Sequence, residues 1–200
     1  MKKILIGTHN QGKFREISYL VSKKYKKISP SKLNIPSPKE TGKTFKANSE
    51  LKANFFSKFV NYEIISDDSG LCIKSLKNGP GIFSARLAKK KGSFLKAMKY
   101  ILKKLEKKRD RSAYFVCSLS YKLPKKKIVT VVEKVNGKIS KKILGKNGFG
   151  YDPIFLPNKS KKTFGEIPKL KKIKIDHRFK AFKKIKKFFW IRYFLLYKNL

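Results

Sequence analysis

Cysteine is scarce in this chain. The 200 residues include only Cys72 and Cys117, and each lies inside an apolar, strand-like run. Such positions favour buried free thiols over a disulfide. This excludes a small secreted domain held together by disulfides, and it favours a cytoplasmic protein.

Long hydrophobic runs are also missing. The apolar part of the N-terminus is only Ile4 to Ile6, too short for a signal peptide. The aromatic stretch from Phe188 to Tyr197 is about half of the ~20 residues that span a bilayer. No repeat is visible, so we expect one two-lobed domain over residues 1–187 and an aromatic C-terminal extension over 188–200. This extension is predicted to lengthen the last helix and pack on the body or on a partner subunit. Interfacial contact with a membrane, beside the lysines of 183–187, is the alternative.

Acidic residues and arginine are few. The chain has 12 Asp and Glu against 52 Lys and Arg, a formal charge of +40, yet only six of the basic residues are Arg. A nucleic-acid-binding protein usually gathers its charge in a patch and uses Arg for bidentate contacts. Here Lys is spread along the chain, with no RNP-type motif and no zinc-finger spacing. We therefore expect a solvated lysine surface. Binding of nucleic acid is the alternative, and it is expected to be weak, nonspecific and sensitive to salt.

Two of the few acids, Asp67 and Asp68, are adjacent. The apolar pair Ile64 and Ile65 precedes them and suits a buried strand, and Ser69-Gly70 suits a tight turn. Neighbouring carboxylates repel unless a cation or a proton joins them. The pattern predicts a Mg²⁺ site that activates water. The simpler alternative is a turn in which one carboxylate accepts bonds from local N–H groups.

The remaining patterns predict an α/β fold with a mixed sheet. Thr44 and Ser93 are expected to cap helices, the first carrying Phe45 to Phe59 and the second running to about Lys107 with Leu95 facing inward. Further helices are expected from about Lys13 to Val21 and from about Asp176. Strands are expected at residues 3–7, 63–67, 71–76 and 113–121, with a hairpin over 128–144 that turns at Asn136-Gly137.

Two segments, residues 8–13 and 148–152, are candidates for binding a ligand. Thr8-His9-Asn10-Gln11-Gly12-Lys13 lies between a strand and a helix, where free N–H groups and the helix dipole attract an anion. Gly148-Phe149-Gly150-Tyr151-Asp152 places two aromatic rings around a glycine, which suits stacking on a flat ring. The alternative for each ring is an ordinary core position.

Taken together, these segments resemble the inosine triphosphate pyrophosphatase family. The matching segments occur in the family's order at 8–13, 40–45, 67–70, 79–86, 148–155 and 177–178. The resemblance implies an elongated α/β fold of mixed sheet and flanking helices, with two lobes around a central nucleotide cleft, usually as a homodimer. It also implies hydrolysis of deaminated purine nucleoside triphosphates (ITP, dITP or XTP) to the monophosphate and pyrophosphate, with Mg²⁺.

The resemblance assigns a role to each matching residue. Glu40 and Asp68 hold the metal with support from Asp67, and Asp68 also activates water. The residues expected to bind the phosphates and sugar are Thr8, His9, Asn10, Gln11, Gly12, Lys13, Lys52 and Ser69. The residues expected to bind the purine base are Phe149, Gly150, Tyr151, Asp152, Lys172, His177 and Arg178.

The chain departs from the family's pattern at three positions: His9 replaces a glycine, Ala47 a glutamate and Asp176 a serine. A Maf-like nucleotide pyrophosphatase of other base specificity is the second enzymatic reading. The segments at 148–155 and 177–178 argue against it.

Overall fold

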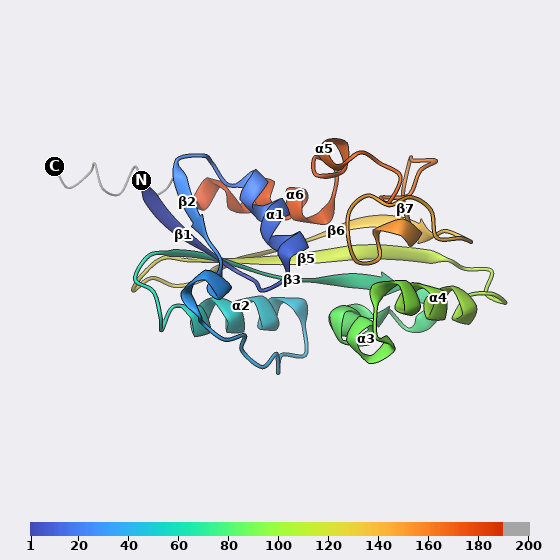
Figure 1. Cartoon of the computed structure of the whole chain (residues 1–200), viewed down its shortest axis with the longest axis horizontal. Helices are drawn as coiled ribbons and strands as arrows, with labels where there is room; N and C mark the ends of the chain where they lie inside the picture. The colour runs from blue at the N-terminus through green and yellow to red at the C-terminus, as the bar shows by residue number, and fades with distance from the viewer. Residues whose placement is uncertain (190–200) are drawn as a thin grey trace. The chain divides into compact units, whose positions relative to one another are not determined.

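The computed structural model describes residues 1–189 and contains one mixed sheet with helices around it (Figure 1). The strands are β1 (Lys2–Gly7), β2 (Tyr25–Ile28), β3 (Glu63–Ile73), β4 (Gly79–Pro80), β5 (Ser112–Lys122), β6 (Val129–Ile139) and β7 (Phe155–Pro157). The α-helices are α1 (Gln11–Leu20), α2 (Phe45–Phe56), α3 (Ser84–Lys91), α4 (Phe94–Lys104), α5 (Lys169–Lys172) and α6 (His177–Ile185). Short 3₁₀ turns occur at Pro30–Leu33, Lys74–Leu76, Gly81–Phe83 and Asp152–Ile154.

The seven-stranded sheet has the order β2-β1-β3-β5-β6-β7, and β4 pairs with β3. Strand β1 is parallel to both β2 and β3, whereas β4 on β3 and β7 on β6 are antiparallel. This confirms the predicted α/β class with a mixed sheet. No helix in the described part of the chain is long and apolar enough to cross a membrane.

The chain forms two compact units. Among the described residues, unit 1 contains 1–68, 118–133 and 178–189, and unit 2 contains 69–117 and 134–177. In unit 1, a core of Leu5, Ile28, Ile35, Phe56 and Ile64 lies between the strands and α2. In unit 2, α3 and α4 contribute Ala88, Ala97, Met98 and Ile101 to a larger core. The cleft that the resemblance implies stays a prediction.

Several local predictions are confirmed. Thr44 caps α2 by accepting the N–H of Ala47, and Ser93 caps α4 by accepting the N–H of Lys96. Both cysteines are free and buried.

Other local predictions are wrong. Ser69-Gly70 makes no turn, because β3 runs without a break from Glu63 to Ile73. Asn136-Gly137 makes no hairpin turn either, since both residues lie inside β6. Helix α2 ends before Phe59, α4 ends at Lys104, and Leu95 is 51% exposed.

The C-terminal extension is described only at its start. The ring of Phe189 stacks on Tyr121 with 4.2 Å between ring centroids, so the extension begins by packing on unit 1. The rest of the predicted extension, residues 190–200, lies outside the described part of the chain.

Candidate active site

The adjacent acids Asp67 and Asp68 lie in the middle of β3. Ile64 and Ile65 anchor this strand in the core, and Ser66 pairs with Gly7 of the parallel neighbour β1. A side chain at Gly7 would not fit, because its Cβ would lie 2.3 Å from Ser66 Oγ. This close approach of β1 to β3 brings the turn that follows β1 next to the two carboxylates.

That turn starts α1 and delivers Lys13 to Asp67. Asn10 caps α1 by accepting the N–H of Lys13 at 3.0 Å, and the N–H of Asn10 is donated to Thr8 Oγ1 at 3.2 Å. The Lys13 ammonium then lies 3.0 Å from Asp67 Oδ1. Within the same turn Gly12 is buried and Gln11 is exposed. His9 is exposed overall, and its Nε2 lies 2.9 Å from the carbonyl oxygen of Ile35.

Asp67 is fully buried and lies between two cations. Besides Lys13, the Arg178 Nε lies 3.5 Å from Asp67 Oδ2, and the same guanidinium donates to Glu16 Oε2 at 2.8 Å. Burial opposes the charge of Asp67, but Lys13 and Arg178, with a contribution from Lys52, outweigh it. They lower the pKa of Asp67 to about 2 from its ordinary 3.8. Asp67 is therefore a fixed anion that holds α1 and α6 against β3.

Asp68 has a different environment on the same strand. Lys52 of α2 lies 3.2 Å from Asp68 Oδ1, and Asn48 donates to Asp68 Oδ2 at 3.3 Å. Burial is the largest influence on this carboxyl and raises its pKa, while Lys52 and Lys13 oppose the increase and Glu40 and Asp67 add to it. Asp68 thus binds a proton more readily than an ordinary aspartate.

Lys52 links Asp68 to Glu40. Its ammonium lies 2.7 Å from Glu40 Oε1, so the two carboxylates that sequence reasoning assigned to the metal converge on one cation. Burial opposes the charged form of Lys52, but Asp68, Asp67 and Glu40 outweigh it and raise the pKa of Lys52. Lys52 is therefore a permanent cation at neutral pH.

Unit 2 contains a second buried charge cluster, around Lys172. Its ammonium lies 2.8 Å from Asp152 Oδ2 and 3.8 Å from Asp176 Oδ2, and it also lies 5.1 Å from the centroid of the Phe149 ring. Asp152 Oδ2 further accepts the N–H of Phe149 at 2.9 Å. The approach of Asp152 requires glycine at position 148, where φ is +75° and a Cβ would meet the carboxylate at 2.0 Å. The glycine-rich segment is thus folded around Asp152.

The aromatic residues assigned to the base have unequal exposure. Phe149 is half-buried, as is Gly150. Tyr151 is 3% exposed, meets Phe94 edge to face and donates its hydroxyl to the carbonyl oxygen of Ser84 at 2.8 Å. His177 is buried, and its ring stacks on Phe115 with 4.7 Å between centroids. Tyr151 and His177 therefore belong to the packed interior of unit 2.

The predicted residues thus form two groups. Unit 1 brings together Thr8, Asn10, Lys13, Glu40, Lys52, Asp67, Asp68 and Arg178, and unit 2 brings together Phe149, Asp152 and Lys172. The chain passes from unit 1 to unit 2 between Asp68 and Ser69, and Ser69 is half-buried in β3.

Sequence reasoning missed two members of the first group, Glu16 and Asn48. Glu16 is 4% exposed and pairs with Arg178, and Asn48 is fully buried and contacts Asp68. Their spacing carried a signal. Glu16 follows Lys13 by three residues and Asn48 precedes Lys52 by four, so each shares a helix face with a predicted site residue.

Carboxylate oxygens of this kind suit Mg²⁺, which prefers hard oxygen ligands and usually takes one or two carboxylates plus water and phosphate oxygens. Glu40 and Asp68 fit that requirement because both already face one cation, Lys52. No group of three or more acidic, His or Cys side chains within residues 1–189 forms a ready-made metal cage. A metal here would take its other ligands from solvent and substrate.

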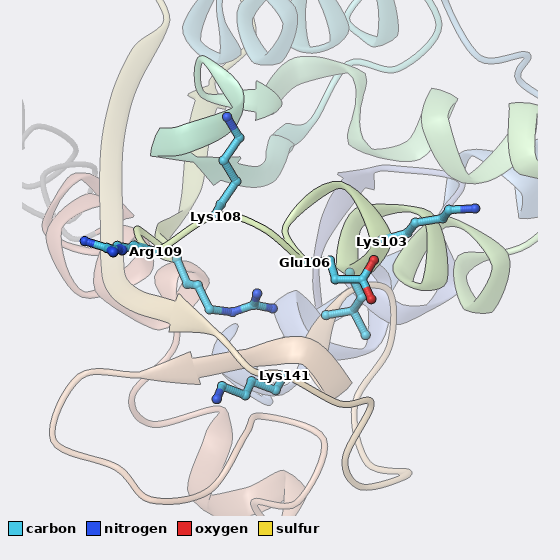
Figure 2. A pocket seen from close by; sticks show the side chains of 7 residues that line it. Lys103, Glu106, Lys108, Arg109 and Lys141 are labelled. Carbon is cyan, nitrogen blue, oxygen red and sulfur yellow. The ribbon is translucent and has the colours of Figure 1, made fainter.

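A separate cavity of about 870 Å³ lies in unit 2 and contains none of the predicted site residues (Figure 2). Its lining consists of Leu102, Lys103, Glu106, Lys108, Arg109, Arg111 and Lys141. It is strongly basic, with five cationic side chains and one carboxylate.

The family model of the Ham1 family matches residues 4–188. The chain belongs to the Ham1 family. It is 40% identical over 190 residues to the dITP/XTP pyrophosphatase of Bacillus licheniformis, covering 92% of this chain and 96% of that protein. The protein of the same name from Bacillus subtilis is 37% identical, with 94% and 96% covered.

Solved structures of the Ham1 family have the same fold. The Staphylococcus aureus Ham1 protein superposes with a TM-score of 0.83 at 36% identity, covering 94% of this chain and 98% of that one. A HAM1 protein from Coxiella burnetii gives a TM-score of 0.85 at 31% identity with the same coverage. The resemblance drawn from the sequence segments is therefore confirmed.

Proposed function

We propose that this Ham1 protein hydrolyses deaminated purine nucleoside triphosphates, namely dITP, ITP and XTP, to the monophosphate and pyrophosphate. Its membership of the Ham1 family and the names of its full-length relatives support this activity. The acidic and basic side chains of unit 1 match its chemistry. A triphosphate needs cations on its oxygens, and the attacking water needs a carboxylate to accept its proton.

The observation that carries the proposal is the contrast between Asp67 and Asp68. Lys13 and Arg178 hold Asp67 as a fixed anion, whereas burial raises the pKa of Asp68 and makes it the better proton acceptor. We assign Asp68 as the general base. It takes a proton from water as the water oxygen attacks the phosphorus of the first phosphate, the one bonded to the sugar. The bond between the first and second phosphates breaks, and pyrophosphate leaves.

We assign Glu40 and Asp68 to hold Mg²⁺, with Asp67 positioning the strand beside them. Bound Mg²⁺ would neutralise negative charge on the phosphate oxygens. The ammonium of Lys52, which now joins the two carboxylates, would turn to a phosphate. Lys13, Thr8 and the N–H groups at the start of α1 are assigned to the same phosphates.

The base is assigned to the residues of unit 2. Lys172 and the half-buried ring of Phe149 are the members whose contacts best suit a polar purine. Arg178 is more complex, because its guanidinium contacts Asp67 and Glu16 within unit 1. We therefore expect Arg178→Ala to slow hydrolysis of every nucleotide, since it removes a cation from Asp67.

The identity of the products tests the reaction class. Phosphorus NMR of an ITP digest should show IMP and pyrophosphate, with no IDP and no early orthophosphate. The reaction should stop in EDTA and resume with added Mg²⁺. IDP with orthophosphate as first products would contradict the proposal. Retention of an oligonucleotide without any turnover would favour the nucleic-acid-binding alternative.

Lys52→Gln should separate metal binding from catalysis. Removing the ammonium leaves Glu40 and Asp68 less neutralised, so calorimetry of Mg²⁺ with nucleotide-free protein should give at least ~3-fold tighter binding. The turnover number should fall roughly 10- to 100-fold, because one phosphate cation is lost. The exposed Lys43→Gln, with the same charge change in the neighbouring loop, should alter neither value by more than about 2-fold. Weaker Mg²⁺ binding in Lys52→Gln would contradict the assignment of these carboxylates.

Three further properties belong to the same proposal. We propose a homodimer, which sedimentation velocity would detect, and a cytoplasmic location, which the free thiols Cys72 and Cys117 favour.

We also propose that residues 1–187 suffice for activity. Truncation after 187 should then keep hydrolysis while lowering the melting temperature, because the Phe189 contact is lost.

A further inference from the structure

The part of β6 that belongs to unit 2, residues 134–139, buries one face and exposes the other. Val135 and Ile139 belong to the core, whereas Lys134, Asn136 and Lys138, which alternate with them, are exposed. At the start of the neighbouring strand β5, Ala113 is in the core and Tyr114 is half-buried, whereas residues 115–121 are buried on both faces. Alternation of this kind leaves one face of the sheet open to solvent.

The open face forms a cavity of about 630 Å³. Its lining consists of Lys74, Asn78, Ser112, Ala113, Tyr114, Lys134, Asn136, Gly137, Lys138 and Asn158. The lining therefore combines three lysines, three asparagine amides and one aromatic ring. No Asp or Glu is among these lining residues. The exposed Asp110 lies close by, and hydrogen bonds from Ser112 and, to a smaller extent, the charges of Lys74 and Lys138 lower the pKa of its carboxyl.

Tyr114 is held in place on this face. Its hydroxyl donates to Asn78 Oδ1 at 3.2 Å, and the Lys134 ammonium lies 5.7 Å from the centroid of its ring. An aromatic ring beside lysines on an open sheet face offers a stacking surface next to phosphate-binding charges. This is the combination that proteins use for single-stranded nucleic acids.

The spacing of the lysines favours a strand over a small anion. Lys134 and Lys138 are four residues apart on one strand, which at ~3.3 Å per residue separates their α-carbons by about 13 Å. At this spacing the two ammonium groups can contact different phosphates of one strand. A second copy of this chain is also disfavoured, because a two-fold contact brings the same face of both copies together and would set lysines against lysines.

The basic cavity of Figure 2 and the open face are lined by consecutive residues of the chain. Arg111 lines the cavity, and Ser112 lines the open face. The Arg111 guanidinium donates to the carbonyl oxygens of Ile139, Leu105 and Ser140 at 2.7–2.9 Å. Within residues 1–189 no carboxylate forms an ion pair with it. This cavity contains no aromatic residue, so it suits phosphates and not bases.

We propose that the open sheet face of unit 2 binds single-stranded nucleic acid without sequence preference, with phosphates on Lys74, Lys134 and Lys138 and a base against Tyr114. The cavity beside Arg111 takes further phosphates of the same strand. This site shares no residue with the nucleotide-hydrolysing site, so it does not depend on the proposed hydrolysis.

Fluorescence anisotropy with labelled 20-mers of oligo(U) and oligo(dT) tests the charges. The triple variant Lys74→Ala/Lys134→Ala/Lys138→Ala should bind each oligomer at least ~10-fold more weakly, and its salt slope should fall by about 2, for three lost phosphate contacts. The matched control is Lys23→Ala/Lys24→Ala/Lys26→Ala, which removes the same charge from exposed positions of unit 1. It should change affinity by less than about 2-fold. Equal losses in both triple variants would mean diffuse attraction and would overturn the proposal.

Tyr114 tests the claim of single-strand binding. Tyr114→Leu should weaken binding of both oligomers by roughly 5- to 10-fold, and Tyr114→Phe, which keeps the ring, should restore most of it. A 20-base-pair duplex should respond to the lysine variant and not to Tyr114→Leu. An unchanged affinity in Tyr114→Leu would contradict stacking, and so would equal losses for duplex and single strand.

ITP hydrolysis should be normal in all these variants. A lysine variant that only changes the sedimentation coefficient would assign this face to a subunit contact instead.

Discussion

Replacing Asp68 with Asn is expected to lower the turnover number for ITP by about two to four orders of magnitude, the usual contribution of a positioned general base. Asparagine keeps the shape of the side chain, and its single oxygen can replace one of the two carboxylate oxygens that accept from Asn48 and Lys52. It cannot accept a proton from water, and it weakens the pair of carboxylates assigned to the metal. The measurement is steady-state pyrophosphate release at saturating ITP and Mg²⁺.

The matched control for this variant is Asp110→Asn. Asp110 is an exposed carboxylate of unit 2, outside the proposed active site, so its loss should leave turnover within about 2-fold. A folded Asp68→Asn protein that keeps most of its activity would remove Asp68 from the role of base. The melting temperature of both variants establishes that they are folded.

Replacing the neighbouring Asp67 with Asn should act mainly on stability. Asp67 is fully buried, and its charge neutralises Lys13 and Arg178. Removing one partner of a buried ion pair typically costs about 3–5 kcal/mol, because the other charge stays buried without compensation. Urea unfolding at pH 7 should show this loss in the free energy of unfolding, whereas Asp110→Asn should change it by less than about 0.5 kcal/mol.

The pH dependence of stability distinguishes a charged Asp67 from a neutral one. Its pKa is lowered in the folded protein, to about 2 from 3.8, so its charge stabilises the fold above pH ~3.8. That contribution, about 2 kcal/mol, is lost as the pH falls from 3.8 towards 2. The gap in unfolding free energy between the wild-type protein and Asp67→Asn should therefore narrow over this range. A gap that is constant from pH 7 to pH 2 would show that Asp67 is not the anion described above.

Sequence reasoning succeeded where local chemistry decides the structure. Thr44 and Ser93 cap their helices as predicted, because a hydroxyl that accepts an N–H three residues ahead acts within one turn of the chain. The matching segments also indicated the correct family. Their residues are tied to a shared chemistry, which leaves a clear signal even in a chain with so much lysine.

The two wrong turns arose from tertiary contacts that override local preference. Ser69-Gly70 stays extended because β4 pairs with Cys72 and Ile73 and prolongs β3 beyond the acids. Gly137 is needed for close packing: a Cβ there would lie 2.3 Å from the carbonyl oxygen of Leu156 in β7. Glycine at a close strand contact and glycine at a turn look alike in a sequence.

The charge pairing of the candidate site was beyond sequence reasoning. Arg178 was assigned to the base by its place beside His177, yet it pairs with Glu16, 162 residues away along the chain. A sequence shows which charges exist, whereas the packing of α1 and α6 on the sheet decides which of them meet. The different environments of Asp67 and Asp68 have the same origin, since adjacent strand residues point to opposite faces.

The most direct test of the proposed function is a comparison of kcat/KM for ITP, dITP, XTP and ATP by pyrophosphate release at saturating Mg²⁺. Hypoxanthine and xanthine carry a keto oxygen where adenine carries an amino group. Donors such as the Lys172 ammonium can bond to the keto oxygen, whereas the amino group of adenine would face them with another donor. We predict that ITP, dITP and XTP exceed ATP by at least ~10²-fold. Equal kcat/KM for ITP and ATP would contradict the proposed role in removing deaminated purine nucleotides, even if pyrophosphate is released from both.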